Sequence, residues 1–155
     1  MLRRFRLPLV VLVAIFIALQ LVPYGRDHTN PPVVADAPWP SAESRQLAVG
    51  ACYDCHSHET RWPPYSWVAP MSWLVTRDVD QGRDEFNFSR WDEDGDEADK
   101  AVEAVEDGDM APRRYQLAHP DARLSAAERQ QLIAALTAMQ GGGDGGRRGS
   151  NRGRQ

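Results

Sequence analysis

Apolar side chains recur every three or four residues in several segments of the chain, which is the spacing of one face of an α-helix. The clearest case lies in residues 92–109, a region dense in acidic residues, where the apolar positions are Ala98, Ala101, Val102 and Val105. We interpret this segment as an amphipathic helix with a solvated acidic face. No segment of any length alternates apolar and polar residues with the period of a β-strand. The pattern therefore predicts an all-α protein.

Residues that begin and end helices support the same fold class. Ser41 can cap a helix that starts at residue 42. Ser125 and Glu128 form a capping box in front of a second apolar face. Gly82 and Gly141 stand where two of the helices are expected to end. The helices predicted in this way cover residues 42–51, 71–82, 98–105 and 125–140, with a short helical turn over 112–115.

The N-terminal residues are first basic and then apolar. Arginine occupies positions 3, 4 and 6, and residues 7–22 contain no charge and one polar residue, Gln20. A basic start before an apolar run is typical of an export signal. Bulky residues stand where a small-x-small cleavage site would be expected, which favours an uncleaved signal anchor over a cleaved peptide. Residues 1–23 are therefore expected to form a single-pass helix in the inner membrane, with the rest of the chain on the periplasmic side.

Composition divides the rest of the chain into three parts. Residues 24–40 are rich in proline, which disfavours helix and predicts an extended linker. Residues 141–155 are mainly glycine and arginine with no apolar side chain, which predicts a disordered tail. Residues 41–140 remain as the helical domain. About 100 residues form a small core, and a bound cofactor would supply much of it.

Charge is distributed unevenly along the chain. The formal net charge is −4, but residues 1–26 carry +4 and residues 141–155 carry +3, which leaves −11 for residues 27–140. An acidic domain favours basic partners and disfavours nucleic acid. Solubility alone is the alternative reason for such a charge.

The chain contains one C-x-x-C-H motif, formed by Cys52, Cys55 and His56, and these are its only two cysteines. Two thiols at this spacing can add to the two vinyl groups of one porphyrin, and the adjoining imidazole can then ligate the iron. A structural zinc site would need a second pair of ligands, which is absent downstream. A dithiol redox site would be expected in a βαβ context, which the pattern does not predict. The motif therefore predicts one covalent haem c.

The sixth iron ligand would have to come from the other face of the ring. His58 lies only two residues from His56, a reach of roughly 7 Å, and cannot pass around the porphyrin. The remaining candidates are His28, Met71, Met110 and His119. Met110 is favoured because it lies in a loop with glycine and proline, far along the chain from the motif. His119, or no sixth ligand, stay as alternatives.

Several short motifs occur along residues 22–136. They are Val22-Pro23-Tyr24-Gly25, Asn30-Pro31-Pro32, Cys52-Tyr53-Asp54-Cys55-His56-Ser57, Thr60-Arg61-Trp62-Pro63 with Tyr65-Ser66, Ala69-Pro70 with Ser72-Trp73-Leu74, Gly82-Arg83, Asn87-Phe88-Ser89 with Trp91, Met110 with Pro112 and Tyr115, His119-Pro120, and Leu124-Ser125. This combination resembles the small single-haem haem-binding domain family of bacterial c-type cytochrome-like proteins. The resemblance implies a fold similar to cytochrome c and a methionine before a proline as the distal ligand. Met110 is the matching residue, with Ala111 between it and Pro112.

These expectations describe a membrane-tethered periplasmic protein in which one covalent haem, ligated by His56 and Met110, transfers single electrons. Its partners would be redox proteins with basic faces. Arg61 and Arg83 are candidates for pairing with the haem propionates, or are ordinary surface charges. A haem-based sensor with a labile distal site is the alternative function. We expect no enzyme, because His119 is the sole candidate for a distal acid or base, and peroxidase-type activity stays open as a third possibility.

Overall fold

The computed structural model describes residues 2–140 of the 155-residue chain. Within these residues all regular structure is helical, apart from one isolated bridge between Ala35 and Arg90. The α-helices are α1 (Leu2–Leu19), α2 (Ala42–Ala51), α3 (Tyr53–His56), α4 (Met71–Glu85), α5 (Trp91–Asp94), α6 (Ala98–Glu106), α7 (Arg113–Ala118) and α8 (Ala126–Gln140). Three short 3-10 helices are η1 (Pro64–Trp67), η2 (Gly95–Glu97) and η3 (Pro120–Ala122). The predicted all-α fold class is confirmed, whereas the predicted tail at 141–155 lies outside the described residues.

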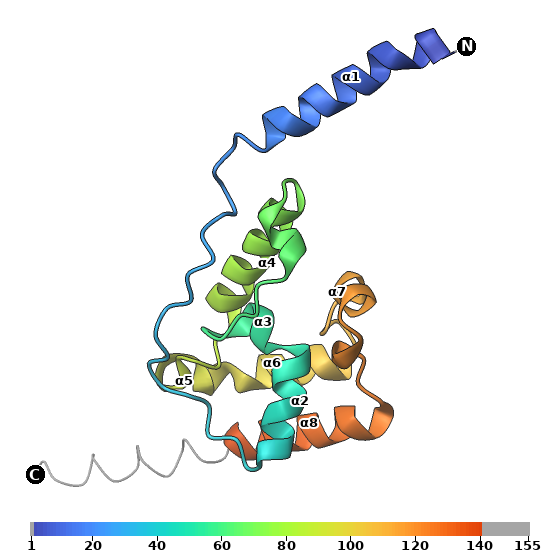
Figure 1. Cartoon of the computed structure of the whole chain (residues 1–155). Coiled ribbons are helices and arrows are strands. Elements are labelled where there is room, and N and C mark those ends of the chain that lie inside the picture. Colours follow the sequence, from blue (N-terminus) through green and yellow to red (C-terminus); the bar gives the residue numbers. More distant parts are fainter. Residues whose placement is uncertain (1, 141–155) are drawn as a thin grey trace, which may run out of the picture.

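Helix α1 covers most of the predicted apolar segment and points away from the other helices (Figure 1). Its large apolar side chains between Leu7 and Ile17 are exposed. Within residues 2–140, however, no helix combines the length and the apolar character that crossing a membrane requires. The membrane helix predicted for residues 1–23 is therefore not seen in the structure.

Residues 24–40 contain no helix, as their proline content predicts, but part of this segment lies against the domain. The backbone N–H groups of Val34 and Ala35 both donate to the Ser89 carbonyl at 3.0 Å. In return, the Trp91 N–H donates to the Ala35 carbonyl at 3.0 Å. These hydrogen bonds hold the extended segment along the residues that follow α4.

Helix α2 leads directly into α3, and the two are joined by hydrogen bonds. Ser41 caps α2 as predicted, because its Oγ accepts from the Ser44 N–H at 3.1 Å. The Cys52 N–H donates to the Ala48 carbonyl at 2.7 Å, and the His56 N–H donates to the Cys52 carbonyl at 2.9 Å. The two cysteines and His56 therefore lie on a hydrogen-bonded backbone that restricts how far they can move.

The apolar faces predicted for residues 98–105 and 125–140 meet in the core. Helix α6 buries Ala98 and Val105, with Ala101 and Val102 packed beside them. Helix α8 packs against α6 and buries Leu132, Ala135, Leu136 and Met139. The capping box is also confirmed: the Ser125 N–H donates to Glu128 Oε2 at 2.7 Å, and the Glu128 N–H donates to Ser125 Oγ at 3.3 Å.

Helix α4 does not end where the sequence predicts. It passes through Gly82 and continues to Glu85. Gly82 is buried, and a Cβ at this position would lie 2.6 Å from the Cys55 carbonyl oxygen. The glycine therefore allows α4 to pack closely on α3, and the prediction that it ends the helix was wrong. The role of Gly82 depends on its contact with Cys55, which lies 27 residues earlier in the sequence.

Candidate functional site

Two adjoining pockets lie between α3, α4, α6 and the loop that follows α6. Their volumes are about 300 and about 230 Å³. Both are lined by Ala51, Cys52, His56, Glu85 and Met110. The larger pocket also reaches the core through Phe86, Phe88, Ala101, Ala104, Val105 and Leu136. The smaller pocket extends to Cys55, Gly82, Pro112 and Tyr115. Every predicted site residue therefore lines at least one of the two pockets.

Both cysteine thiols are free in the structure. Burial raises the pKa of Cys52 to about 12. Burial, with the negative charges of Asp78 and Asp54, raises the pKa of Cys55 to about 11. Both groups are therefore neutral thiols at pH 7, which suits a pocket that is mostly apolar.

We expect these thiols to react slowly with iodoacetamide while they are free. The thiolate is the reactive form, and an ordinary cysteine has a pKa of about 8.5. At pH 8 the alkylation rate should be about 100-fold or more below that of free cysteine, and it should rise with pH until about pH 11. Mass spectrometry of the alkylated protein without haem measures this rate. Alkylation at the rate of free cysteine at pH 8, in protein whose circular dichroism shows it to be folded, would contradict the buried placement.

The His56 imidazole is oriented by the backbone of α4's C-terminal end. Its Nδ1 lies 2.9 Å from the Phe86 carbonyl oxygen, which can only accept a hydrogen bond. Nδ1 therefore carries the proton, and the lone pair is on Nε2. Burial lowers the pKa of His56, which keeps the ring neutral at pH 7. A neutral imidazole with one nitrogen fixed by a backbone carbonyl is the arrangement that iron-ligating histidines use.

Met110 is brought to the same cavity by the loop after α6. Gly108 adopts a φ of 78°, in the left-handed region that favours glycine. The N–H groups of Asp109 and Met110 then both donate to the Ala104 carbonyl, at 3.0 and 3.1 Å. This turn fixes the backbone at Met110, which lines both pockets. A thioether is thus placed beside the cavity that the cysteines and His56 line.

The other candidates for a sixth ligand line neither pocket. His119 Nε2 is hydrogen-bonded to the Tyr65 hydroxyl at 2.7 Å. The His28 ring lies between Trp62 and Trp67, with centroid distances of 4.3 and 4.1 Å. Met71 is exposed at the start of α4. The arrangement favours Met110 among the four.

Arg61 and Arg83, the two candidates for pairing with the haem propionates, also lie outside the two pockets. Arg61 forms an ion pair with Asp54, with Nε at 3.1 Å from Oδ1. Arg83 Nε donates to the Ser57 carbonyl at 2.8 Å. Neither lines the two pockets, whereas Lys100 lines the larger pocket and Arg114 the smaller one. These two cations were missed in the sequence because only the packing of α6 and α7 places them there.

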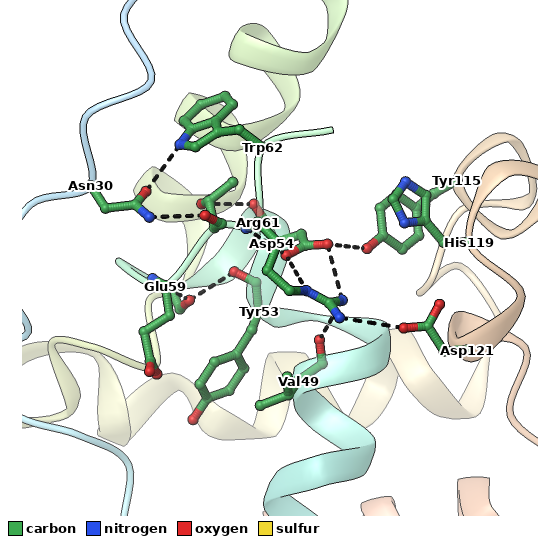
Figure 2. Close-up of polar contacts among 12 residues, drawn as sticks. Asn30, Val49, Tyr53, Asp54, Glu59, Arg61, Trp62, Tyr115, His119 and Asp121 are labelled. Carbon is green, nitrogen blue, oxygen red and sulfur yellow. Dashed lines mark hydrogen bonds and ion pairs between the residues drawn. The ribbon is translucent and has the colours of Figure 1, made fainter. Parts of the chain in front are cut away.

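Asp54, which lies between the two cysteines, is the centre of a polar network (Figure 2). Its buried carboxylate accepts hydrogen bonds from Arg61 and from the Tyr115 hydroxyl, the latter at 2.7 Å. Burial and this hydrogen bond raise the pKa of Tyr115, so the hydroxyl stays protonated and donates. Sequence reasoning did not find this network, because Asp54 and Tyr115 are 61 residues apart.

The residues around the cavity fit a haem attached through sulfur. Two neutral thiols, one oriented imidazole and one thioether surround a space that is otherwise mostly apolar. Within residues 2–140, no group of three or more His, Cys, Asp and Glu side chains is placed to hold a metal ion directly.

In residues 2–140, fold and cavity together define a small helical protein with thiol, imidazole and thioether groups around two adjoining pockets. The model of the haem-binding domain family matches residues 14–138. The chain belongs to this family, which confirms the resemblance found in the sequence and supports haem as its cofactor. No curated protein and no solved structure matches the chain. Similarity to the cytochrome c fold therefore stays a prediction.

Proposed function

We propose that the protein carries one haem c, bonded to Cys52 and Cys55 and ligated by His56 and Met110, and that it transfers single electrons. The observation that carries this proposal is the meeting of all four residues at one cavity. Met110 belongs to a loop more than fifty residues after the motif, so no local sequence constraint brings it there.

Each residue has a distinct part in this function. The thiols of Cys52 and Cys55 would fix the porphyrin on a hydrogen-bonded turn. His56 would offer Nε2, because Nδ1 is held by the Phe86 carbonyl. Apolar residues of α6 and α8 contribute to the cavity lining, and methionine ligation and burial both raise the reduction potential of a haem. Bound there, the haem would supply reversible one-electron chemistry at iron.

Two other functions have less support. We assign no peroxidase activity, because the candidate acid or base His119 is engaged by Tyr65 and does not line the pockets. A haem-based sensor is the second candidate. It is favoured by one observation: α7, which follows Met110, contains no buried residue, so the distal side could open.

Export and membrane attachment belong to the same proposal. The basic start and the apolar residues 7–22 support a signal anchor, with the haem domain on the periplasmic side. The net charge of −11 over residues 27–140 supports redox partners with basic faces. Asp84, Glu85 and Glu97 bring part of that acidic charge to the cavity lining.

Expression of the full chain in an exporting bacterial host with cytochrome maturation tests these points together. We expect the haem stain in the membrane fraction, on a denaturing gel, at the mass of the chain. The reduced pyridine haemochrome should be that of a haem with two thioether bonds, at one haem per chain. A colourless protein with two free thiols would overturn the proposal.

Met110→Ala tests the sixth ligand. The oxidised protein should lose the weak near-infrared band of methionine bound to iron, because no other candidate lines the pockets. The reduced protein should gain carbon monoxide binding at pH 7, and its reduction potential should fall. Met71→Ala is the matched control, since Met71 is exposed and outside the cavity. Equal spectra for the two variants would contradict ligation by Met110.

A further inference from the structure

One hydrogen bond joins the cysteine motif to the segment that carries Met110. The Tyr115 hydroxyl donates to Asp54 Oδ2 at 2.7 Å (Figure 2). Asp54 lies between Cys52 and Cys55, and Tyr115 lies five residues after Met110. We call this contact the Tyr115–Asp54 clasp. It connects the two sides of the cavity, because Tyr115 lines the smaller pocket together with Cys55 and Met110.

The Asp54 side of the clasp is held rigidly. Oδ1 accepts from the Arg61 backbone N–H at 2.9 Å and from Arg61 Nε at 3.1 Å. Oδ2 accepts from Arg61 Nη2 at 3.2 Å. Arg61 is itself fixed, since Nη2 also donates to the Val49 carbonyl at 3.2 Å. A buried carboxylate that accepts this many hydrogen bonds has a well-defined position without Tyr115.

The Tyr115 side depends on the clasp far more. Helix α7 contains no fully buried residue; Tyr115 is half-buried, with its ring stacked on that of His119 at a centroid distance of 4.1 Å. Hydrophobic burial therefore holds α7 less firmly than it holds the core helices. Helix α7 also has an ion pair between Arg114 and Asp78 at 2.9 Å, but the arginine is largely exposed, so this pair contributes little. The clasp differs because its acceptor is buried, charged and shielded from water.

Movement of Tyr115 would be transmitted to Met110. The Tyr115 N–H donates to the Pro112 carbonyl at 2.9 Å. Gln116 Nε2 donates to the Ala111 carbonyl at 2.6 Å. These bonds make residues 111–116 a locally closed unit, so the start of α7 and the Met110 backbone are expected to shift together.

We propose that Tyr115 is a positioning residue for the sixth ligand: the Tyr115–Asp54 clasp holds the Met110 side of the cavity closed against the cysteine motif. This inference rests on the proposed function, because it assumes that Met110 ligates the iron. Without the clasp, α7 and the Met110 loop would leave the cavity part of the time, and a small external ligand would gain access. The clasp thus sets the balance between a closed electron-transfer site and an open binding site.

Tyr115→Phe in the full-length holoprotein tests the inference, since it removes one hydroxyl and keeps the ring. The pyridine haemochrome and the haem content should match the wild type, because the cysteines are untouched. The near-infrared methionine band should weaken at pH 7, and carbon monoxide affinity of the reduced protein should rise about tenfold or more, as expected for loss of a hydrogen bond to a charged group.

Tyr65→Phe is the matched control. It removes a hydroxyl from another half-buried tyrosine, which bonds His119 and not Asp54. Because His119 is stacked on Tyr115, this control also measures what that stack contributes without the loss of the clasp. Its methionine band and carbon monoxide affinity should stay at wild-type values. Far-ultraviolet circular dichroism of both variants verifies that helix content is unchanged.

The outcomes separate the inference from the proposed function. A wild-type band and wild-type carbon monoxide affinity in Tyr115→Phe would overturn the clasp, while ligation by Met110 would stand. An equal change in Tyr65→Phe would also overturn it, since the effect would then come from the contacts of Tyr65, His119 and Tyr115 and not from the hydrogen bond to Asp54. A wild-type protein that lacks the band and binds carbon monoxide as Met110→Ala does would overturn both.

Discussion

A protein in which Cys52 and Cys55 are both alanine is expected to contain no covalent haem. These are the chain's only cysteines, so no other side chain can form a thioether bond to the porphyrin vinyl groups. Both line the cavity, Cys52 in each pocket and Cys55 in the smaller one. The haem stain on a denaturing gel should fall from one haem per chain to background, because only a covalently attached haem survives denaturation.

The same double variant is expected to be much less stable than the holoprotein. A domain of about 100 residues has a small core, and the loss of haem leaves an apolar space of about 300 Å³ without its occupant. His58→Ala is the control for this experiment, since His58 follows the motif but lines neither pocket. A haem-stained band in the double variant, or its loss in His58→Ala, would contradict the assigned attachment.

Local patterns were sufficient to predict the helices of the core. The apolar positions of residues 98–105 and the capping box at Ser125 depend on neighbours within four residues, and both are confirmed. The cysteine motif is equally local, and the chain's family supports the haem that it predicts. Signals of this kind can be found in a sequence because the physical cause lies within one or two helical turns.

Contacts between distant residues could not be predicted in the same way. Glycine is typical of a helix end, which is why Gly82 was predicted to end α4. In the structure a glycine is needed there because the Cys55 backbone in α3 leaves no room for a Cβ. Proline predicts that residues 24–40 are extended, but not that Val34 and Ala35 bind the Ser89 carbonyl. Each of these features depends on how two elements pack together, and the spacing of apolar residues along the sequence does not indicate that packing.

The candidate site shows both cases at once. Met110 was favoured because a glycine- and proline-containing loop can fold over a cavity, and the loop does reach it. Asp54 and Tyr115 both belong to the motifs of the family resemblance, but nothing in the sequence indicated that the two side chains are hydrogen-bonded, because they are 61 residues apart. The residues that would do the chemistry could be named, whereas those that hold them in place could not.

Gly82→Ala is expected to destabilise the holoprotein strongly, although alanine is the better helix former. In an exposed helix the same change would stabilise by about 1 kcal/mol. Here the new Cβ would lie 2.6 Å from the Cys55 carbonyl oxygen and 3.0 Å from the Cys55 Cβ. Neither atom can move without moving α3, so we expect a loss of about 3 kcal/mol in the free energy of unfolding, measured by urea titration.

Two controls separate this clash from other effects. Arg77→Ala changes an exposed position of the same helix, and its free energy of unfolding should stay within about 0.5 kcal/mol of the wild type. Gly50→Ala adds the same methyl group in α2, where the nearest atom is the Asp121 carbonyl oxygen at 3.1 Å, so it should cost less than Gly82→Ala. Because the clash displaces Cys55 itself, Gly82→Ala should also reduce haem incorporation. Equal or greater stability for Gly82→Ala would mean that α4 does not pack on the cysteine motif as closely as the structure places it.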